Sequence, residues 1–436
     1  MLTRRAFCAG LAAGAAVRAF GAGPSSCRLR LGIVSDVHVK AGDTGFNSVA
    51  RVERVFRMFR ARGADAVVIP GDIATDGMEN SFAEVMSAWD AVFPKGRGAD
   101  GEPVERVFIY GNHDGRECSG ATWTRFFGEE YAPIRMRTVK GYRFVCADWR
   151  HEDESAAFVR AHRDELAGTR PFFHVQHRPL KDTIFGPWAW DHDSGAVGAA
   201  LAEFPNAVSL TGHAHYTLAD ERNVWQGEFT AIGCASLSFT GVASGEFMPV
   251  GFENYRCDML RMGERRDEAV EGAKMMRRFM GPPQFLFLSV YDDALVVERF
   301  LLEKDKVRKM GSDWTIPWPA DGSFAFDRRR ELLPPPAAAQ VLSVRSGEVR
   351  NRRGETFAAR IVSLAGEPPP GACGRIRHWE VFARSPEGRT LAMKRVANPC
   401  FTRLPDGRPL EVPFAGLPSD TVFTAVARDC WGRGTE

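Results

Sequence analysis

The sequence predicts an α/β fold with a largely parallel sheet, followed by a small all-β domain. Near the N-terminus, a short apolar run is followed by a polar loop and then a helical pattern, and this unit repeats. A proline- and alanine-rich stretch at residues 334–339 then interrupts the chain as a stiff linker. Beyond it, only short β-forming segments separated by turn residues occur.

The first three units define where a ligand site is expected. Residues 29–35, 65–70 and 104–110 are apolar and β-branched, as buried strands are. Residues 48–62 and 81–93 between them carry apolar side chains at helical spacing. Each predicted strand ends in a polar loop with Asp or His. Because open α/β sheets bind ligands at the carboxyl ends of their strands, we expect a site there.

The pattern continues through the rest of the large domain. Further strands are predicted at residues 142–149, 172–175 and 207–210, with helices at 154–166 and 194–204. More strands are expected between residues 223 and 239, and a hairpin at 284–290 and 294–300. We therefore assign residues 28–333 to one domain.

Residues 340–436 are expected to form a small β-sandwich. The predicted strands are residues 340–344, 356–364, 378–383, 390–396 and 421–427. The ending at residues 416–432 resembles the last hairpin of a fibronectin type III module. Cell-surface or glycan contact is one role that this domain could have.

Bulk composition excludes some classes of partner. The chain has 436 residues, 44% of them hydrophobic and 26% charged, with a formal net charge of +2. This charge gives no reason to expect a nucleic-acid duplex or an anionic membrane as the main partner. After the N-terminus no apolar run reaches 18 residues, so no transmembrane span is expected in the mature chain.

The N-terminus resembles a bacterial twin-arginine export signal. Arg4 and Arg5 precede a small, apolar run at residues 6–17, and residues 19–21 resemble a cleavage site. The alternative is an amphipathic first helix. We expect residues 1–22 to be removed and the protein to be periplasmic or extracellular.

Cysteine usage fits an exported protein. Removal of the signal leaves eight cysteines, and one disulfide among Cys373, Cys400 and Cys430 is plausible in an oxidising compartment. Cys27 could carry a lipid anchor, but the residues before it fit a lipobox poorly. The spacings do not suggest a thiolate metal site.

Polar residues with metal-binding chemistry gather at five predicted strand ends. They are Asp36, His38, Asp72, Asn112, His113, His177, His213 and His215. His213 and His215 flank one residue, so in an extended segment both side chains point to the same face. Five of the chain's ten histidines lie in these segments. Other histidines, such as His151, His162 and His378, are interpreted as solvated or core residues.

This set of motifs resembles the calcineurin-like metallophosphoesterases. The matching elements are Asp36-x-His38, Gly71-Asp72, Gly111-Asn112-His113-Asp114, His177 and Gly212-His213-x-His215. They occur in the family's order over about residues 28–240. The resemblance implies a four-layer α/β/β/α sandwich with a dinuclear metal centre at one edge.

The resemblance also implies how the ligands are shared. One metal would be bound by Asp36, His38, Asp72 and His215, and the other by Asp72, Asn112, His177 and His213. Asp72 would bridge the two. The oxygen and nitrogen donors suit Mn, Fe, Zn or Co. In the family, a metal-bridging hydroxide is the nucleophile, and two metals about 3.5–4 Å apart clamp the reacting oxygens.

The resemblance gives His113 a role in proton transfer. Its counterpart in the family protonates the leaving group, and Asp114 would hold the ring in its tautomer and orientation. The alternative for Asp114 is that it caps the following turn. The bridging Asp72 is not followed by a metal-binding tyrosine, so the chain is less similar to purple acid phosphatases than to the bacterial branch with cyclic-nucleotide phosphodiesterases.

Substrate contacts are predicted only from proximity to the motifs. Candidates for binding phosphate oxygens are Arg116, Arg178 and Lys181, and ordinary surface charge is the alternative. The insert at residues 184–192 could bring Trp188 and His192 over the site, or its tryptophans could pack the loop down. Tyr216, next to His215, has the same two interpretations.

The predicted function is metal-dependent hydrolysis of a small phosphorylated substrate, either a phosphomonoester or a phosphodiester. An alternative of the same class is a pyrophosphate or phospholipid headgroup hydrolase. An alternative of another class is a surface-binding protein in which the metal centre only stabilises the fold.

Overall fold

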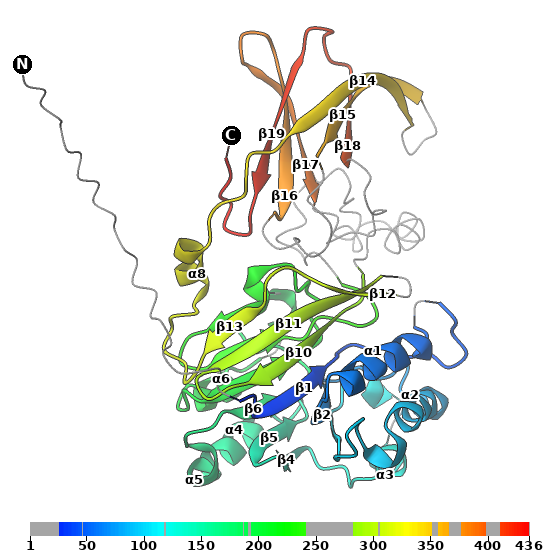
Figure 1. Cartoon of the computed structure of the whole chain (residues 1–436), viewed down its shortest axis with the longest axis vertical. Coiled ribbons are helices and arrows are strands. Elements are labelled where there is room, and N and C mark those ends of the chain that lie inside the picture. Colours follow the sequence, from blue (N-terminus) through cyan, green and yellow to red (C-terminus); the bar gives the residue numbers. More distant parts are fainter. Residues whose placement is uncertain are drawn as a thin grey trace, which may run out of the picture.

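The computed structural model consists of a large α/β part and a smaller all-β part (Figure 1). The structure describes residues 26–435, except 46, 117–118, 186, 191–192, 241–281, 304–305, 351–355, 366–375 and 398–409. The predicted export signal therefore lies outside the described residues. None of the described helices is long and apolar enough to cross a membrane.

The first sheet of the α/β part has seven strands. Its order is β12-β11-β10-β1-β2-β3, and β13 pairs with β11. The strands are β1 (Leu29–Ile33), β2 (Ala66–Ile69), β3 (Glu105–Phe108), β10 (Gln284–Val290), β11 (Ala294–Glu303), β12 (Lys306–Lys309) and β13 (Trp314–Pro317). β1, β2 and β3 are parallel, while β10 runs antiparallel to β1. The carboxyl ends of β1, β2 and β3 therefore meet at one edge.

The second sheet has six strands in the order β4-β5-β6-β7-β9-β8. They are β4 (Ile134–Val139), β5 (Tyr142–Ala147), β6 (Phe172–Val175), β7 (Ala207–Thr211), β8 (Val224–Gln226) and β9 (Thr230–Gly233). The four strands β5, β6, β7 and β9 are parallel. This sheet delivers the segments with His177, His213 and His215.

The two sheets pack face to face over a shared apolar core. Leu31 and Leu288 from the first sheet belong to the same buried cluster as Phe144 and Phe173 from the second. Each such fully buried side chain contributes about 1.5–3 kcal/mol relative to exposure. The outer face of each sheet carries a separate buried cluster shared with helices. The four-layer α/β/β/α prediction is thus confirmed.

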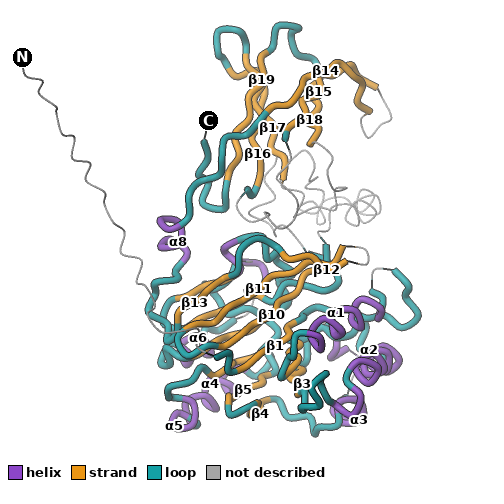
Figure 2. The backbone as a smooth tube through the Cα atoms, viewed as in Figure 1, coloured by secondary structure: helices purple, strands orange, loops and turns teal. Residues whose placement is uncertain are grey.

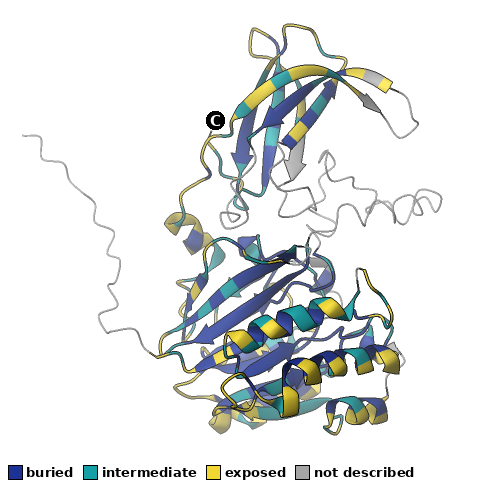
Figure 3. Cartoon of the chain, turned by 45° about the vertical axis from the view of Figure 1, so that its right-hand side comes forward, coloured by how far each residue is buried: buried dark blue, intermediate teal, exposed yellow. Residues whose placement is uncertain are grey.

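The helices lie on the outer faces of the two sheets (Figure 2). Helices α1 (Val49–Ala61), α2 (Glu79–Val92) and α3 (Gly120–Phe127) cover the first sheet, and α4 (Glu152–Ala161), α5 (Arg163–Leu166) and α6 (Ala196–Leu201) belong to the second. Ser48 caps α1, since its side chain accepts a hydrogen bond from the Ala50 amide. A Cβ on Gly32 would lie 2.3 Å from the Phe59 ring, so α1 packs directly on β1. In Figure 3 these helices bury one face and expose the other.

The C-terminal part consists of two three-stranded antiparallel sheets. Their orders are β14-β15-β18 and β17-β16-β19. The strands are β14 (Val341–Arg350), β15 (Thr356–Leu364), β16 (His378–Arg384), β17 (Thr390–Ala397), β18 (Leu410–Ala415) and β19 (Val422–Arg428). Trp379, Val362 and Phe414 share one buried cluster, as expected for a sandwich.

Several local predictions need correction. Residues 154–166 are not one helix, because α4 ends at Ala161 and α5 begins at Arg163. Six elements are not predicted from the sequence: α3, α8 (Phe326–Leu332), β4, β12, β13 and β18. In β4, arginines alternate with apolar residues, so the strand lacks a strongly apolar run. Of the three cysteines proposed for a disulfide, Cys430 is a free thiol, and Cys373 and Cys400 lie outside the described residues.

Candidate metal centre

The predicted ligands converge at the edge where the carboxyl ends of both sheets meet. Asp36 and His38 follow β1, and Asp72 follows β2. His177 and His213 come from beyond β6 and β7 of the opposite sheet. Among the residues that the structure describes, three groups have ligand atoms within 4.8 Å of one another: Asp36–His38–His215, His38–Asp72–His113 and Asp36–Asp72–His177.

Two glycines permit this close approach. A Cβ on Gly111 would lie 2.1 Å from both the backbone nitrogen and Oδ1 of Asp72. A Cβ on Gly212 would lie 2.0 Å from Ser35 Oγ. A side chain at either position would push the loops that carry the predicted ligands apart. This explains why the predicted motifs have glycine at these positions.

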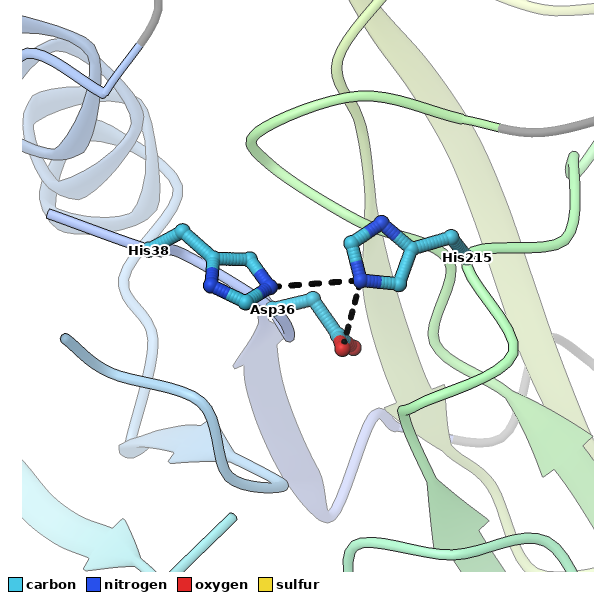
Figure 4. Close-up of side chains that lie close together, drawn as sticks. All are labelled: Asp36, His38 and His215. Atoms are coloured by element: carbon cyan, nitrogen blue, oxygen red, sulfur yellow. Dashed lines mark hydrogen bonds and ion pairs between the residues drawn. The ribbon is translucent and has the colours of Figure 1, made fainter. Parts of the chain in front are cut away.

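The first group joins residues from both sheets (Figure 4). His215 Nε2 lies 3.0 Å from Asp36 Oδ1 and 3.3 Å from His38 Nε2. The other ring nitrogen of His215, Nδ1, lies 2.9 Å from the Phe239 carbonyl oxygen, to which it donates. This contact directs the Nε2 lone pair towards His38 and Asp36, which is the arrangement that a metal ligand needs.

Asp72 lies between the two predicted metal sites. The same atom, Oδ2, is 3.5 Å from His38 Nε2 and 3.4 Å from His177 Nε2. Its other oxygen accepts a hydrogen bond of 2.8 Å from the His113 amide. A carboxylate in this position can face two cations at once, as the bridging role requires.

Asn112, the amide predicted to bind the second metal, lies beside His177. His177 Nε2 is 3.0 Å from Asn112 Oδ1, and His177 Nδ1 is 2.8 Å from the Pro70 carbonyl oxygen. The rings of His177 and His213 lie 5.0 Å apart, centroid to centroid. The His213 amide donates to both oxygens of Asp36, at 3.1 and 2.9 Å. All seven predicted ligands are therefore within one cluster.

The two buried carboxylates of the site favour cation binding. Burial is the largest influence on Asp72 and would raise its pKa, but His177 and His38 outweigh burial and lower it. Burial lowers the pKa of His38 to about 3, which leaves a neutral imidazole. Although burial opposes it, the carboxylates of Asp72 and Asp36 raise the pKa of His177 to about 9. Two carboxylates among buried imidazoles thus attract positive charge, and this donor set suits two transition-metal ions.

The ligand loops have unusual backbone geometry. Asp36, His38, Asp72, His213 and His215 all have φ between 47° and 63°, in the left-handed region. Residues other than glycine rarely adopt this conformation, and it costs about 1–3 kcal/mol at each site. Since five of the seven predicted ligands share it, the surrounding fold holds these side chains in place against local preference.

His113 and Asp114 are placed differently from the prediction. His113 Nδ1 donates to the Thr75 carbonyl oxygen at 2.7 Å. Both oxygens of Asp114 accept from backbone amides, of Ile73, Ala74 and Gly111, at 2.8–3.1 Å. The prediction that Asp114 holds the His113 ring is therefore wrong. Asp114 fixes the backbone of the loop after β2, and a carbonyl group of that loop orients the ring.

The predicted substrate contacts have mixed outcomes. Tyr216 is buried, and its hydroxyl donates to Asp220 at 2.6 Å and accepts from Arg222 at 2.8 Å. Since this hydroxyl is engaged inside the fold, the prediction that Tyr216 contacts substrate is wrong. The Arg178 guanidinium lies 3.9 Å from the centroid of the Trp149 ring. Lys181 is exposed, so its charge remains available to a ligand.

The side chains of the remaining predicted substrate contacts are not among those that the structure describes. The structure describes the backbone of Arg116 and Trp188 but not the positions of their side chains, and His192 is not among the described residues. Their roles remain predictions.

Several residues that support the site are not predicted from the sequence. Ser35 Oγ donates to Asp36 Oδ2 at 2.7 Å, and the carbonyl groups of Thr75, Phe239 and Pro70 each orient a histidine. Backbone carbonyl groups leave no trace in residue identity. Only Ser35 could have been found, since it directly precedes Asp36.

Comparisons with known proteins agree with this site. Residues 29–216 match the sequence profile of the family described as calcineurin-like phosphoesterase. A search of curated proteins gave no significant match.

Solved structures show only distant similarity. A dimetal phosphatase from Danio rerio is 12% identical, with 67% of this chain and 100% of that chain covered and a TM-score of 0.43. Vacuolar protein sorting 29 from Cryptosporidium parvum is 11% identical, with 66% and 100% covered and a TM-score of 0.33. An amidase of the nitrilase superfamily from Nesterenkonia is 10% identical, with 71% and 97% covered and a TM-score of 0.25. Similarity at this level does not support a functional conclusion.

Proposed function

We propose that the protein hydrolyses phosphoric mono- or diesters of small molecules, at the site within residues 29–216, which match the calcineurin-like phosphoesterase profile. The observation that carries the proposal is Asp72 Oδ2, which lies 3.5 and 3.4 Å from ring nitrogens of His38 and His177. These two histidines come from opposite sheets and belong to different predicted metal sites.

The donor set supports two metal ions. Asp36, His38, Asp72 and His215 would hold one ion, and Asp72, Asn112, His177 and His213 the other. Two such ions, when bound, supply Lewis acidity for the phosphoryl oxygens and an activated water molecule as nucleophile. Mn, Fe, Zn and Co all accept these ligands.

His113 is proposed as the general acid. Its Nδ1–H donates to the Thr75 carbonyl oxygen, which fixes the ring and leaves Nε2 to carry the transferable proton. The His113 amide also donates to Asp72, so the backbone of His113 is fixed relative to the carboxylate proposed to bridge the two metals. Protonation of the leaving oxygen by such a group contributes about 10²–10⁴-fold in rate. Asp114 supports this indirectly, by holding the amides of the loop that carries Thr75.

The test compares leaving groups. Wild-type protein loaded with Mn, Fe, Zn or Co is assayed on p-nitrophenyl phosphate, bis-p-nitrophenyl phosphate and phenyl phosphate, and its metal content is measured. His113→Ala should lower turnover of phenyl phosphate by about 100-fold or more, because phenoxide needs protonation. The loss on p-nitrophenyl phosphate, which has a better leaving group, should be smaller, and two metals should remain bound.

Two results would contradict the proposal. Metal-loaded wild-type protein inert on all three esters would exclude the proposed activity on simple mono- and diesters. Equal losses of His113→Ala on both leaving groups would remove His113 from the role of acid while leaving the metal-dependent activity in place.

A further inference from the structure

A second polar cluster lies beside the metal centre, at the ends of β5 and β6. These strands are parallel neighbours, with Cys146 opposite Val175. The residues after them therefore emerge at the same edge as His177. Arg150 follows β5, and Arg178 follows His177 and interacts electrostatically with His213. This side of the site is rich in arginine.

Arg150 is fixed in orientation by a buried carboxylate. Its Nε lies 2.9 and 3.1 Å from the two oxygens of Asp148, and its Nη2 also contacts Asp148. The Tyr131 hydroxyl donates to the same carboxylate and accepts from Arg150 Nη2 at 3.3 Å. Asp148 is 2% exposed at its side chain, whereas the Arg150 side chain is 47% exposed. The pair therefore presents a rigid, positively charged end to solvent.

The exposed end of Arg150 faces the turn that follows His113. A Cβ on Gly115, two residues after His113, would lie 3.6 Å from Arg150 Nη1. Within the part of the chain that the structure describes, Nη1 has no hydrogen-bond partner, unlike Nε and Nη2. Two N–H groups held in a fixed direction are thus directed to the side of the site where His113 lies.

We propose that Arg150 binds an anionic group in the leaving alcohol of the substrate. The inference rests on the proposed function, because the general acid His113 defines the side on which the alcohol departs. A guanidinium forms charge-assisted hydrogen bonds with carboxylate and phosphate oxygens. The substrates are therefore phosphoric esters whose alcohol carries a second negative charge.

Two ester pairs test this specificity and separate carboxylate from phosphate. Glycerol 3-phosphate is compared with 3-phosphoglycerate, and fructose 6-phosphate with fructose 1,6-bisphosphate. Wild-type enzyme should have the higher kcat/KM on the second member of at least one pair. Arg150→Gln should reduce that preference about tenfold or more, mainly through KM, since a hydrogen bond to a charged group is lost.

A matched control is available on the outer helix layer. Arg160 on α4 has a similarly exposed side chain, at 45%, and pairs with Glu203 at 2.7 Å. Arg160→Gln should leave the preference unchanged. The double variant Asp148→Asn/Arg150→Gln removes the guanidinium without leaving a buried carboxylate unpaired, and should lose the preference as the single variant does.

A binding measurement separates this inference from the proposed function. Calorimetry compares 3-phosphonopropionate with propylphosphonate, and 6-phosphonohexanoate with hexylphosphonate, which none of the variants can hydrolyse. Tighter binding of a carboxylate-bearing member to wild type, lost in Arg150→Gln, supports the anion site even if no ester is hydrolysed. The inference is overturned if neither esters nor phosphonates show a preference, or if the preference persists in Arg150→Gln.

Discussion

Replacement of Gly111 by alanine is the sharpest test of how the site is built. The new Cβ would meet the backbone nitrogen and Oδ1 of Asp72 at 2.1 Å. Carbon and oxygen atoms need about 3.4–4 Å, so the Asp72 loop has to move by roughly 1 Å or more. A displacement of about 1 Å at a catalytic group costs about 100-fold in rate.

We therefore expect Gly111→Ala to lower kcat/KM on p-nitrophenyl phosphate by about 100-fold and to weaken metal binding. The control is Gly198→Ala on α6. No atom lies within 4 Å of a Cβ at Gly198, so this variant should fold with equal or slightly higher stability and normal metal content. Activity, metal analysis and urea unfolding are measured for both variants. Wild-type activity and metal content in Gly111→Ala would refute the close packing of these two loops.

Three further predictions concern stability and export. Arg329 on α8 forms a buried ion pair of 2.8 Å with Glu221, so Arg329→Met should destabilise the protein by about 3–5 kcal/mol in urea unfolding; an unchanged midpoint would contradict the pairing. Burial lowers the pKa of His174 to about 4, so the unfolded state binds the proton more readily. The contribution of neutral, buried His174 to the free energy of unfolding is therefore fully present above about pH 6.5 and is lost as the pH falls to about 4. Unfolding of His174→Gln, followed over this range, should show a weaker pH dependence than wild type. For export, replacement of Arg4 and Arg5 by lysine should retain the protein in the cytoplasm of a bacterial host, as cell fractionation would show; unimpaired export would exclude the twin-arginine signal.

The residues predicted as metal ligands lie together because their positions follow from the strand pattern. Each of the predicted strands ends within a few residues of its ligand, and parallel strands necessarily bring these ends to one edge. The spacing of His213 and His215 predicted an extended segment, but both residues have left-handed backbone, so that premise is wrong. Gly111 and Gly212 were recognisable from the motifs they begin. The four layers came from the family resemblance, whereas the strand and helix pattern alone predicted only an α/β fold.

The contacts that hold the site's side chains in place were harder to predict, because most of them are made by backbone carbonyl and amide groups, which every residue has. Proximity in sequence suggested that Asp114 holds His113, but the ring is held by the carbonyl group of Thr75 in the loop after β2. Proximity also placed Tyr216 at the substrate, although its side chain turns inward to Asp220. Proximity along the chain brings the backbones of two residues together, but it does not determine the direction in which either side chain points.

Left-handed backbone geometry distinguishes five of the residues predicted to bind the metals. These residues adopt a conformation that their residue types disfavour, so their side chains leave the loops in directions that local propensity does not give. Such geometry persists only because surrounding contacts over-determine it. At Asp36 these contacts are visible, since its carboxylate accepts from Ser35 Oγ and the His213 amide. Positions of this kind are where a fold departs from local rules, and here they coincide with the residues proposed to bind the metals.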